Sequence, residues 1–268
     1  MLSFPPHTLR AAPTLLPVIF RGSGVVALAK PAGVPVDEHP WTRGVPDICG
    51  EFRKRLAAGT ASAVALGLKR PAAVLSTDAE CSGAALLADR DGGALEKWRN
   101  AAGSELLRFF FVFLTRVSAG TSAEGEFVCR LPVAAHFTEA RALVSRKTGK
   151  KAETRFCRLE NFGNVELWRA ETAFPRLHQI RLHAAESGIP VLGDALYGGA
   201  PAVSNAELSR KGRLNKGEER PLYAPPCLHL ERISVPAGAP TENGAEIVAP
   251  LPDGFAALVG KLRRSRGG

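Results

Sequence analysis

The chain has 268 residues, of which 45% are hydrophobic, and a formal net charge of +9. Its apolar runs are too short for a membrane span of about 20 residues, and its five scattered cysteines, which form no CxxC pair, argue against a zinc site or a disulfide framework. The length allows one large domain or two small ones, and the positive charge favours nucleic acid as a partner over a protein that is merely soluble and basic.

The N-terminus, residues 1–16, is predicted as a frayed, proline-rich lead-in. No acidic residue precedes Asp37, which is typical of a transit peptide, but four prolines among the first 17 residues would break the amphipathic helix that such a peptide needs. No charged segment leads into a long apolar run, so a secretory signal is not expected either. Together with the unpaired cysteines, this favours the cytoplasm.

The remainder, residues 17–268, contains no linker that would divide it, so we expect a single domain. Hydrophobic patterns and turn residues predict a strand at 25–30, helices at 45–59 and 92–103, a strand at 108–117, two strands joined by the turn NFGN within 152–174, a strand at 227–235 and a C-terminal helix at 252–266. Many strands in long hairpins with few helices predict an α+β fold around a mainly antiparallel mixed sheet with flanking helices.

Basic residues gather in two segments. Residues 141–155 hold six basic residues against one acid, and residues 209–220 hold five more. Either segment alone is more typical of a solvated loop, but together they could line one face and bind phosphates in a salt-dependent way. The predicted contacts to an RNA backbone are Lys30, Arg146, Lys147, Lys150, Lys151, Arg210, Lys211 and Arg213.

Two polar stretches could carry chemistry. Asp78 follows a predicted strand and precedes a small-residue turn, CSG, where a ligand could approach the backbone; a lone aspartate there is more often a turn former. Further along, two histidines, two arginines and a glutamine crowd the start of a short helix within 175–199. The alternative to a catalytic role is an ordinary ion pair for Arg181. For His178 and His183 the alternative is structural hydrogen bonding. Their five-residue spacing and the lack of an HExxH pattern argue against a metal site.

Five segments stand in a recognisable order: VVALAKPAGVPV, LSTDAECSG, RFFFVFL, KKAETRFCRL and RLHQIRLHAAESGIPVLGDALYGG. This order resembles the RluA-type pseudouridine synthases, which isomerise uridine in RNA, and the resemblance runs from about residue 17 to residue 236. The most specific match is HQIR with the following GIPVLGDALYG, which includes Asp194 and Tyr197.

The resemblance implies a pseudouridine synthase-like fold with a central RNA-binding cleft. It implies that Asp78 is the catalytic carboxylate and that Arg181 pairs with it. We expect the substrate to be rRNA or tRNA and the protein to be a monomer, and we expect neither a cofactor nor a metal to take part. The substrate-pocket residues that it implies are Phe110, Ser76, Cys81, Ser82, Gly83, Arg176, His178 and Gln179.

Three positions depart from the family pattern. Ser76 stands where the family has the arginine that occupies the space of the flipped base, and Leu75 replaces its histidine neighbour. The Lys-x-Tyr of the long strand is best matched by Arg108 and Phe110, so the tyrosine hydroxyl is absent there. These departures leave an alternative open, a catalytically weak RNA-binding homologue that acts in RNA folding or assembly. A basic hydrolase unrelated to RNA is not expected.

Overall fold

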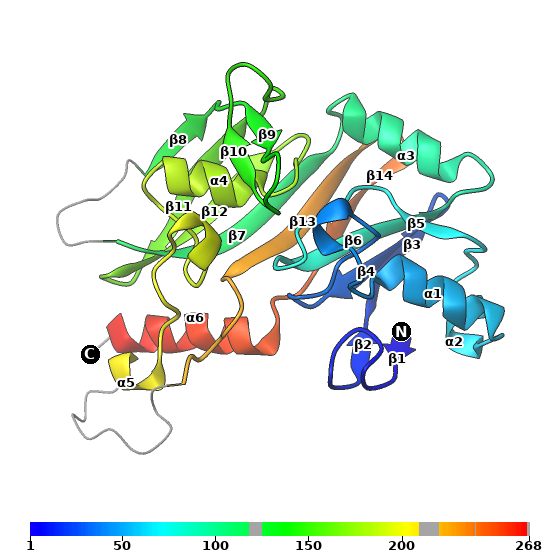
Figure 1. Cartoon of the computed structure of the whole chain (residues 1–268), viewed down its shortest axis with the longest axis horizontal. Coiled ribbons are helices and arrows are strands. Elements are labelled where there is room, and N and C mark those ends of the chain that lie inside the picture. Colours follow the sequence, from blue (N-terminus) through cyan, green and yellow to red (C-terminus); the bar gives the residue numbers. More distant parts are fainter. Residues whose placement is uncertain (118–124, 209–219, 239, 267–268) are drawn as a thin grey trace.

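The structure, a computed structural model, describes residues 1–117, 125–208, 220–238 and 240–266 (Figure 1). The predicted RNA contacts Arg210, Lys211 and Arg213 lie outside these residues. The strands are β1 (Leu2–Phe4), β2 (Thr14–Leu16), β3 (Val18–Gly22), β4 (Val25–Lys30), β5 (Pro71–Ala73), β6 (Ser82–Asp89), β7 (Arg108–Arg116), β8 (Glu126–Cys129), β9 (Val133–Ala135), β10 (Ala142–Val144), β11 (Thr154–Asn161), β12 (Val165–Thr172), β13 (Leu228–Ala237) and β14 (Asn243–Val248). The helices are η1 (Pro40–Thr42), α1 (Ile48–Ala57), α2 (Ala61–Val64), α3 (Ala94–Gly103), α4 (Gln179–Glu186), η2 (Ala195–Tyr197), α5 (Asn205–Leu208) and α6 (Asp253–Arg266).

One large mixed sheet organises the fold. Its strand order is β3-β4-β6-β13-β7-β12-β11-β8, with β14 added beside β13 and β5 beside β6. The pair β13–β6 is parallel, and the other pairs of this sheet are antiparallel. Figure 1 shows helices on both sides of the strands. The predicted α+β class and the mainly antiparallel mixed sheet are therefore confirmed.

Both faces of the sheet are buried because apolar residues fill both sets of alternating positions. In β4, Val25 and Ala27 join one core, while Val26 and Leu28 join another. The first core includes residues of α3 and α4, and the second includes residues of α1 and of the β1–β2 hairpin. Further along, α6 covers a third core on β7 and β12. Each fully buried aliphatic side chain contributes about 1.5–3 kcal/mol to this packing.

The N-terminal segment is folded, so the expectation of a frayed lead-in is wrong. β1 and β2 form an antiparallel pair, and Leu2, Phe4 and Leu16 are at most 2% exposed. They pack in the same core as Phe52 of α1. Four prolines prevent a helix here, but they leave the apolar side chains between them free to pack as a short hairpin. The division of the chain at residue 17 stays a prediction.

The predicted turn CSG is also wrong, because Ser82 and Gly83 begin the buried strand β6. Gly83 has φ +119°, and a Cβ atom there would collide with the backbone of Leu230 in β13, whose N atom would lie 2.7 Å away. Small residues at this point thus allow two strands to approach each other rather than a ligand to approach the backbone.

Among the described residues, no helix combines the length and the apolar character that crossing a membrane requires.

Candidate active site

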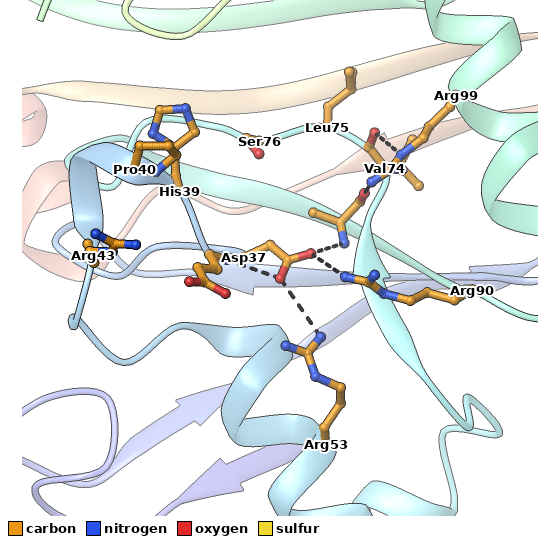
Figure 2. A pocket seen from close by; sticks show the side chains of 12 residues that line it. Asp37, His39, Pro40, Arg43, Arg53, Val74, Leu75, Ser76, Arg90 and Arg99 are labelled. Atoms are coloured by element: carbon orange, nitrogen blue, oxygen red, sulfur yellow. Dashed lines mark hydrogen bonds and ion pairs between the residues drawn. The ribbon is translucent and has the colours of Figure 1, made fainter. Parts of the chain in front are cut away.

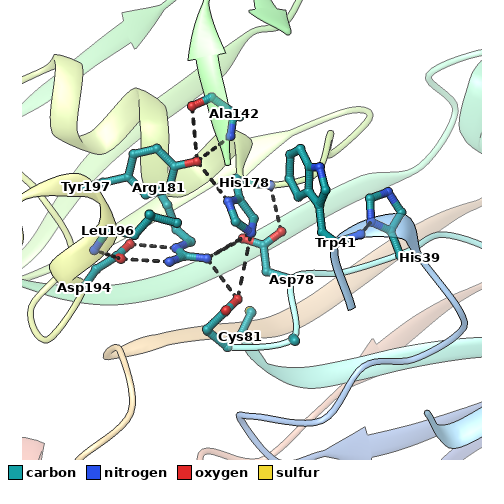
Figure 3. Close-up of polar contacts among 12 residues, drawn as sticks. His39, Trp41, Asp78, Cys81, Ala142, His178, Arg181, Asp194, Leu196 and Tyr197 are labelled. Carbon is teal, nitrogen blue, oxygen red and sulfur yellow. Dashed lines mark hydrogen bonds and ion pairs between the residues drawn. The ribbon is translucent and has the colours of Figure 1, made fainter. Parts of the chain in front are cut away.

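Asp78 lies where the chain passes from β5 to β6, facing the start of α4 (Figure 3). It is 8% exposed, and its Oδ1 accepts a hydrogen bond of 2.8 Å from the backbone N–H of His178. His178 caps α4 with a left-handed backbone, φ 58°, which is uncommon for a residue with a side chain. That turn of the backbone directs the N–H toward the carboxylate. Within the described chain, Oδ2 accepts no hydrogen bond, which leaves one oxygen available for a substrate.

Arg181, which is 2% exposed, lies beside this carboxylate, but its main partner is not Asp78. Its Nε and Nη2 donate to both oxygens of Asp194 at 2.6 and 2.8 Å, and its Nη1 donates to Glu80 at 2.9 Å. The distance from Nη1 to Asp78 Oδ2 is 4.0 Å. The expected Asp78–Arg181 pair is therefore present only as a long contact. The bidentate partner is Asp194, because a guanidinium fork matches one carboxylate at a time.

The charges around Arg181 are unbalanced. One guanidinium faces three carboxylates, those of Asp78, Glu80 and Asp194. Burial by itself would lower the pKa of Arg181, but the hydrogen bonds to Asp194 and the three negative charges outweigh burial and raise that pKa above its usual range. Arg181 is thus a permanent cation in a buried site, and its position is fixed by Asp194.

His178 contacts both this ion-pair cluster and the aromatic side chain of Tyr197. Its Nε2 lies 3.1 Å from Arg181 Nη1, and its Nδ1 lies 2.9 Å from the hydroxyl of Tyr197. Because a guanidinium only donates, Nε2 must accept and the proton must sit on Nδ1. Burial lowers the pKa of His178, with the Asp78 charge opposing, which agrees with a neutral ring. Tyr197 also accepts from the N–H of Ala142 at 2.7 Å, so the β9–β10 hairpin is tied to the site.

A small cavity of about 60 Å³ is lined by chain neighbours of Asp78 and by His178, although Asp78 itself is not part of the lining. The η1 segment forms one side of it: the Trp41 ring lies 5.0 Å from that of His178, and His39 packs edge-on against Trp41 at 5.3 Å. Thr77 lines the cavity as well, and its Oγ1 is buried with no hydrogen-bond partner in the described chain. A donor and acceptor without a partner beside Asp78 is suited to a polar ligand. The full lining is Pro35, Val36, Asp37, His39, Trp41, Thr42, Ser76, Thr77, Ala79, Glu80, Ala140, Leu177 and His178.

Lys30 does not reach toward solvent, so its expected contact with an RNA backbone is not supported. It is 3% exposed, and its Nζ donates to the carbonyl oxygens of Val34 at 3.0 Å, Ala79 at 3.1 Å and Cys81. These carbonyls belong to the turn after β4 and to the loop that carries Asp78. Lys30 therefore holds the Asp78 loop in place from inside the protein.

Several expected pocket residues have structural roles instead. Cys81 and Ser82 are each 1% exposed, and Ser82 Oγ lies 2.9 Å from Nδ1 of His229. Gln179 is fully buried, and its amide donates to Glu153 and to two threonine hydroxyls at the ends of β11 and β12. His183 likewise contacts Thr154 and the carbonyl of Leu131, which confirms the structural alternative for this residue.

Phe110 points away from Asp78. Its neighbours Phe109 and Phe111 pack in the core that includes Ile180 of α4, so strand alternation directs Phe110 to the opposite face of the sheet. There the guanidinium of Arg232 lies 3.7 Å from the centre of its ring. The expected stacking of Phe110 on a substrate base is therefore wrong.

Two larger basic clefts lie on the surface. The first, which we call the arginine cleft, has a volume of about 660 Å³ and is drawn in Figure 2; Ser76 and His39 line both this cleft and the cavity beside Asp78. Its charged lining residues are Asp37, Glu38, Arg43, Arg53, Arg90 and Arg99. The second, of about 560 Å³, has Arg176, Lys150 and Lys151 in its lining. Arg176 thus lies in a separate cleft from Asp78, while Arg146 and Lys147 are exposed in the turn after β10.

No group of three or more histidine, cysteine, aspartate or glutamate side chains in the described residues is placed to hold a metal ion.

Comparison with known proteins supplies the context for this geometry. No family model matches the chain. The ribosomal large subunit pseudouridine synthase D of Haemophilus influenzae is 32% identical over 148 residues, which make up 55% of this chain and 43% of that protein. An uncharacterized RNA pseudouridine synthase of Bacillus subtilis is 24% identical over 257 residues, 95% of this chain and 75% of that protein. The chain is thus similar in sequence to RNA pseudouridine synthases. It spans less than half the length of the first curated relatives that it matches.

The predicted pseudouridine synthase-like fold is confirmed by solved structures. Human RNA pseudouridylate synthase domain containing 4 superposes with a TM-score of 0.66 at 19% identity, covering 92% of each chain. Human RNA pseudouridylate synthase domain containing 1 gives a TM-score of 0.60 at 20% identity.

The sequence alone missed several residues of the site. Asp194 and Tyr197 stand in the quoted GDALYG segment, so their spacing from HQIR was the available signal. Glu80 lies two residues after Asp78 and carried no separate signal. Trp41 and His39 lie in a segment without any motif, and only the fold brings them to Asp78.

Proposed function

We propose that this protein isomerises uridine to pseudouridine in RNA and that Asp78 is the carboxylate that acts on the target nucleotide. The observation that carries the proposal is the state of Asp78: its Oδ1 accepts from the His178 N–H, and its Oδ2 accepts no hydrogen bond in the described chain. A cavity is lined by the residues before and after it, Thr77 and Ala79. A buried carboxylate with one oxygen held and one free can act on a single atom of a bound ligand.

The reaction needs no other reagent, because it is an isomerisation. The bond between N1 of uracil and C1′ of ribose breaks, the base turns, and a bond from C5 to C1′ forms; C5 loses a proton and N1 gains one. The carboxylate either attacks C1′ or assists elimination from the sugar, and both routes would use the free oxygen Oδ2 of Asp78. Arg181 Nη1 lies 4.0 Å from that oxygen. The preceding residue, Thr77, has a buried hydroxyl with no hydrogen-bond partner in the described chain.

The departures from the family pattern at positions 76 and 110 differ in what they imply for catalytic activity. Since Phe110 faces the opposite side of the sheet, the missing hydroxyl at that position gives no argument against turnover. Ser76 does border the cavity and is exposed, so the lack of an arginine there affects how the base leaves its stack. This supports an active isomerase with a changed base-flipping apparatus over an inactive RNA-binding homologue.

RNA, either rRNA or tRNA, is the proposed substrate class. The arginine cleft shares His39 and Ser76 with the cavity, and the second cleft contributes Lys150 and Lys151, so both clefts offer cations to RNA phosphates. We further propose that the protein acts as a monomer in the cytoplasm, without a metal or a cofactor, and that residues 17–268 work as one domain.

The decisive experiment maps pseudouridine in cellular RNA from cells with and without this protein, complemented by variants. We expect sites that are lost on deletion to be restored by wild type and not by Asp78→Asn, because the amide keeps the size of the side chain but cannot act as an anionic nucleophile or base. The matched control is Asp91→Asn, since Asp91 is an exposed residue in a surface ion pair with Arg70.

Two outcomes would contradict the proposal. If no site depends on the protein, although it binds RNA in a salt-dependent way, the RNA-binding alternative is correct. If Asp78→Asn restores every site, the role of Asp78 is wrong. Thermal melting of both variants separates loss of activity from loss of folding.

A further inference from the structure

One large apolar side chain is fully exposed beside the site. Phe137 lies in the loop between β9 and β10 and is 100% exposed, more than any other large hydrophobic residue in the described chain. Exposed apolar side chains are common in proteins, but they are seldom aromatic rings without any covering contact. A ring held in water is available to stack on another flat, apolar surface.

The loop that carries Phe137 is internally ordered. The Nδ1 of His136 accepts hydrogen bonds from the N–H groups of Thr138 and Glu139 at 3.3 and 3.1 Å. The backbone N–H of His136 donates to the carbonyl of Arg141 at 2.8 Å, and Arg141 forms an ion pair with Glu139. These contacts fix the turn while they leave the Phe137 ring free, so little conformational entropy would be lost when the ring binds a partner.

The same loop reaches the cavity beside Asp78. Ala140 is part of the cavity lining, and Ala142 is hydrogen-bonded to Tyr197, which contacts His178. Figure 3 shows Ala142 of the hairpin next to Tyr197 and above the ion-pair cluster. Phe137 and Ala140 are three positions apart along the chain, so their Cα atoms are at most about 11 Å apart.

Ser76 is too small to fill the space that a flipped base leaves in the RNA stack. When a uridine leaves its stack, the neighbouring bases lose a contact, and proteins often fill the gap with an apolar or aromatic wedge. The short hydroxyl side chain of Ser76 cannot fill a base-sized gap. The Phe137 ring is large enough, exposed and near the cavity.

We propose that Phe137 stacks on an RNA base beside the target uridine and so stabilises the RNA in its unstacked form. This inference rests on the proposed function, because it assigns a specificity role within the same site. It makes Phe137 a determinant of structured RNA substrates, on which unstacking is costly, rather than of unstructured ones.

The test uses the full chain, a short hairpin RNA with one uridine within its stack, and a single strand of matched composition that cannot pair. Phe137→Trp places a fluorophore at the tip of the loop, and stacking on a base should quench its emission when the hairpin is added. Phe137→Ala should weaken hairpin binding by roughly 5- to 150-fold, the range expected for loss of one aromatic–base stack. It should weaken single-strand binding less. Val64→Ala, at a 54% exposed position of α2, is the control and should change neither affinity.

The outcomes separate this inference from the proposed function. Hairpin binding by wild type, without quenching in Phe137→Trp and without loss in Phe137→Ala, overturns the role of Phe137 and leaves the function standing. Failure of wild type to bind either RNA overturns both, and the exposed ring would then suit a protein partner. Equal losses on both RNAs would show a general contact with bases and overturn the specificity role.

Discussion

Replacement of Lys30 by methionine should reveal a buried ammonium group through a pH-dependent difference in stability. Burial lowers the pKa of Lys30 from 10.5 to about 8, with the charges of Cys81, Asp78 and Glu80 opposing. In the unfolded chain the side chain keeps its ordinary, higher pKa. Between these two values the unfolded state therefore binds more protons than the folded state, and the stability of the wild type rises with pH. The methionine variant lacks this dependence.

The magnitude follows from the two pKa values. From pH 7 to about pH 9.5, the stability of wild type relative to Lys30→Met should increase by about 2 kcal/mol. At pH 7 the variant should already be less stable, because the buried carbonyls of Val34 and Cys81 lose their ammonium donor, at about 1–3 kcal/mol for each unsatisfied group.

Urea unfolding of both proteins at the two pH values measures this difference. Groups common to both proteins, such as the buried thiols, cancel when the two are compared at the same pH. Lys97→Met, at an exposed position of α3, is the control and should show no pH-dependent difference. A stability difference between wild type and Lys30→Met that shrinks as pH rises would refute the reasoning, because it would mean that the carbonyl cage raises the pKa of Lys30.

Two further substitutions test the packing of the site. Asp194→Ala should lower the free energy of unfolding by about 3–5 kcal/mol in chemical denaturation, because Arg181 would lose its bidentate partner in a buried position; a loss below about 1 kcal/mol would show that Glu80 can replace Asp194. Gly83→Ala should cost about 2–6 kcal/mol from backbone strain and the collision with Leu230. Gly92→Ala is its control, since Gly92 also has a positive φ, +97°, but nothing lies within 4 Å of the added Cβ. Equal losses at both glycines would exclude the collision as the cause.

The strands and helices that the sequence predicts best are those with a clear period and clear ends. The strand predicted at 108–117 is β7 (Arg108–Arg116), and the hairpin predicted around NFGN is β11 and β12. In each case β-branched and aromatic residues repeat until turn residues or charges end the strand. β6 was missed because its sequence, SGAALLAD, consists of small residues with no alternation. Such a strand is buried on both faces, and only its neighbours in the sheet identify it.

The sequence predicted several residues of the site but not the contacts that they make. Asp78, His178 and Arg181 are close together, as the resemblance implied. The expectation for Phe110 is not supported because side chains alternate along a strand, so its ring lies on the opposite face from those of Phe109 and Phe111. The predicted contact of Lys30 with an RNA backbone is not supported, because a charged residue in a sequence gives no information about its burial. Two of the carbonyl partners of Lys30, those of Ala79 and Cys81, come from positions 49 and 51 residues away along the chain.

The carboxylates around Arg181 have different contacts, so Arg181 can lie beside Asp78 without occupying both of its oxygens. Had both oxygens of Asp78 accepted from the guanidinium fork, no oxygen would be left for a substrate. Instead Asp194 occupies the fork, and only Nη1 faces Asp78, at 4.0 Å. At that separation a gross attraction of about 4 kcal/mol remains at an effective dielectric constant of about 20. The buried Asp194 therefore fixes the cation, the His178 N–H fixes Oδ1, and Oδ2 of Asp78 is left with an attractive charge nearby but no hydrogen bond to break.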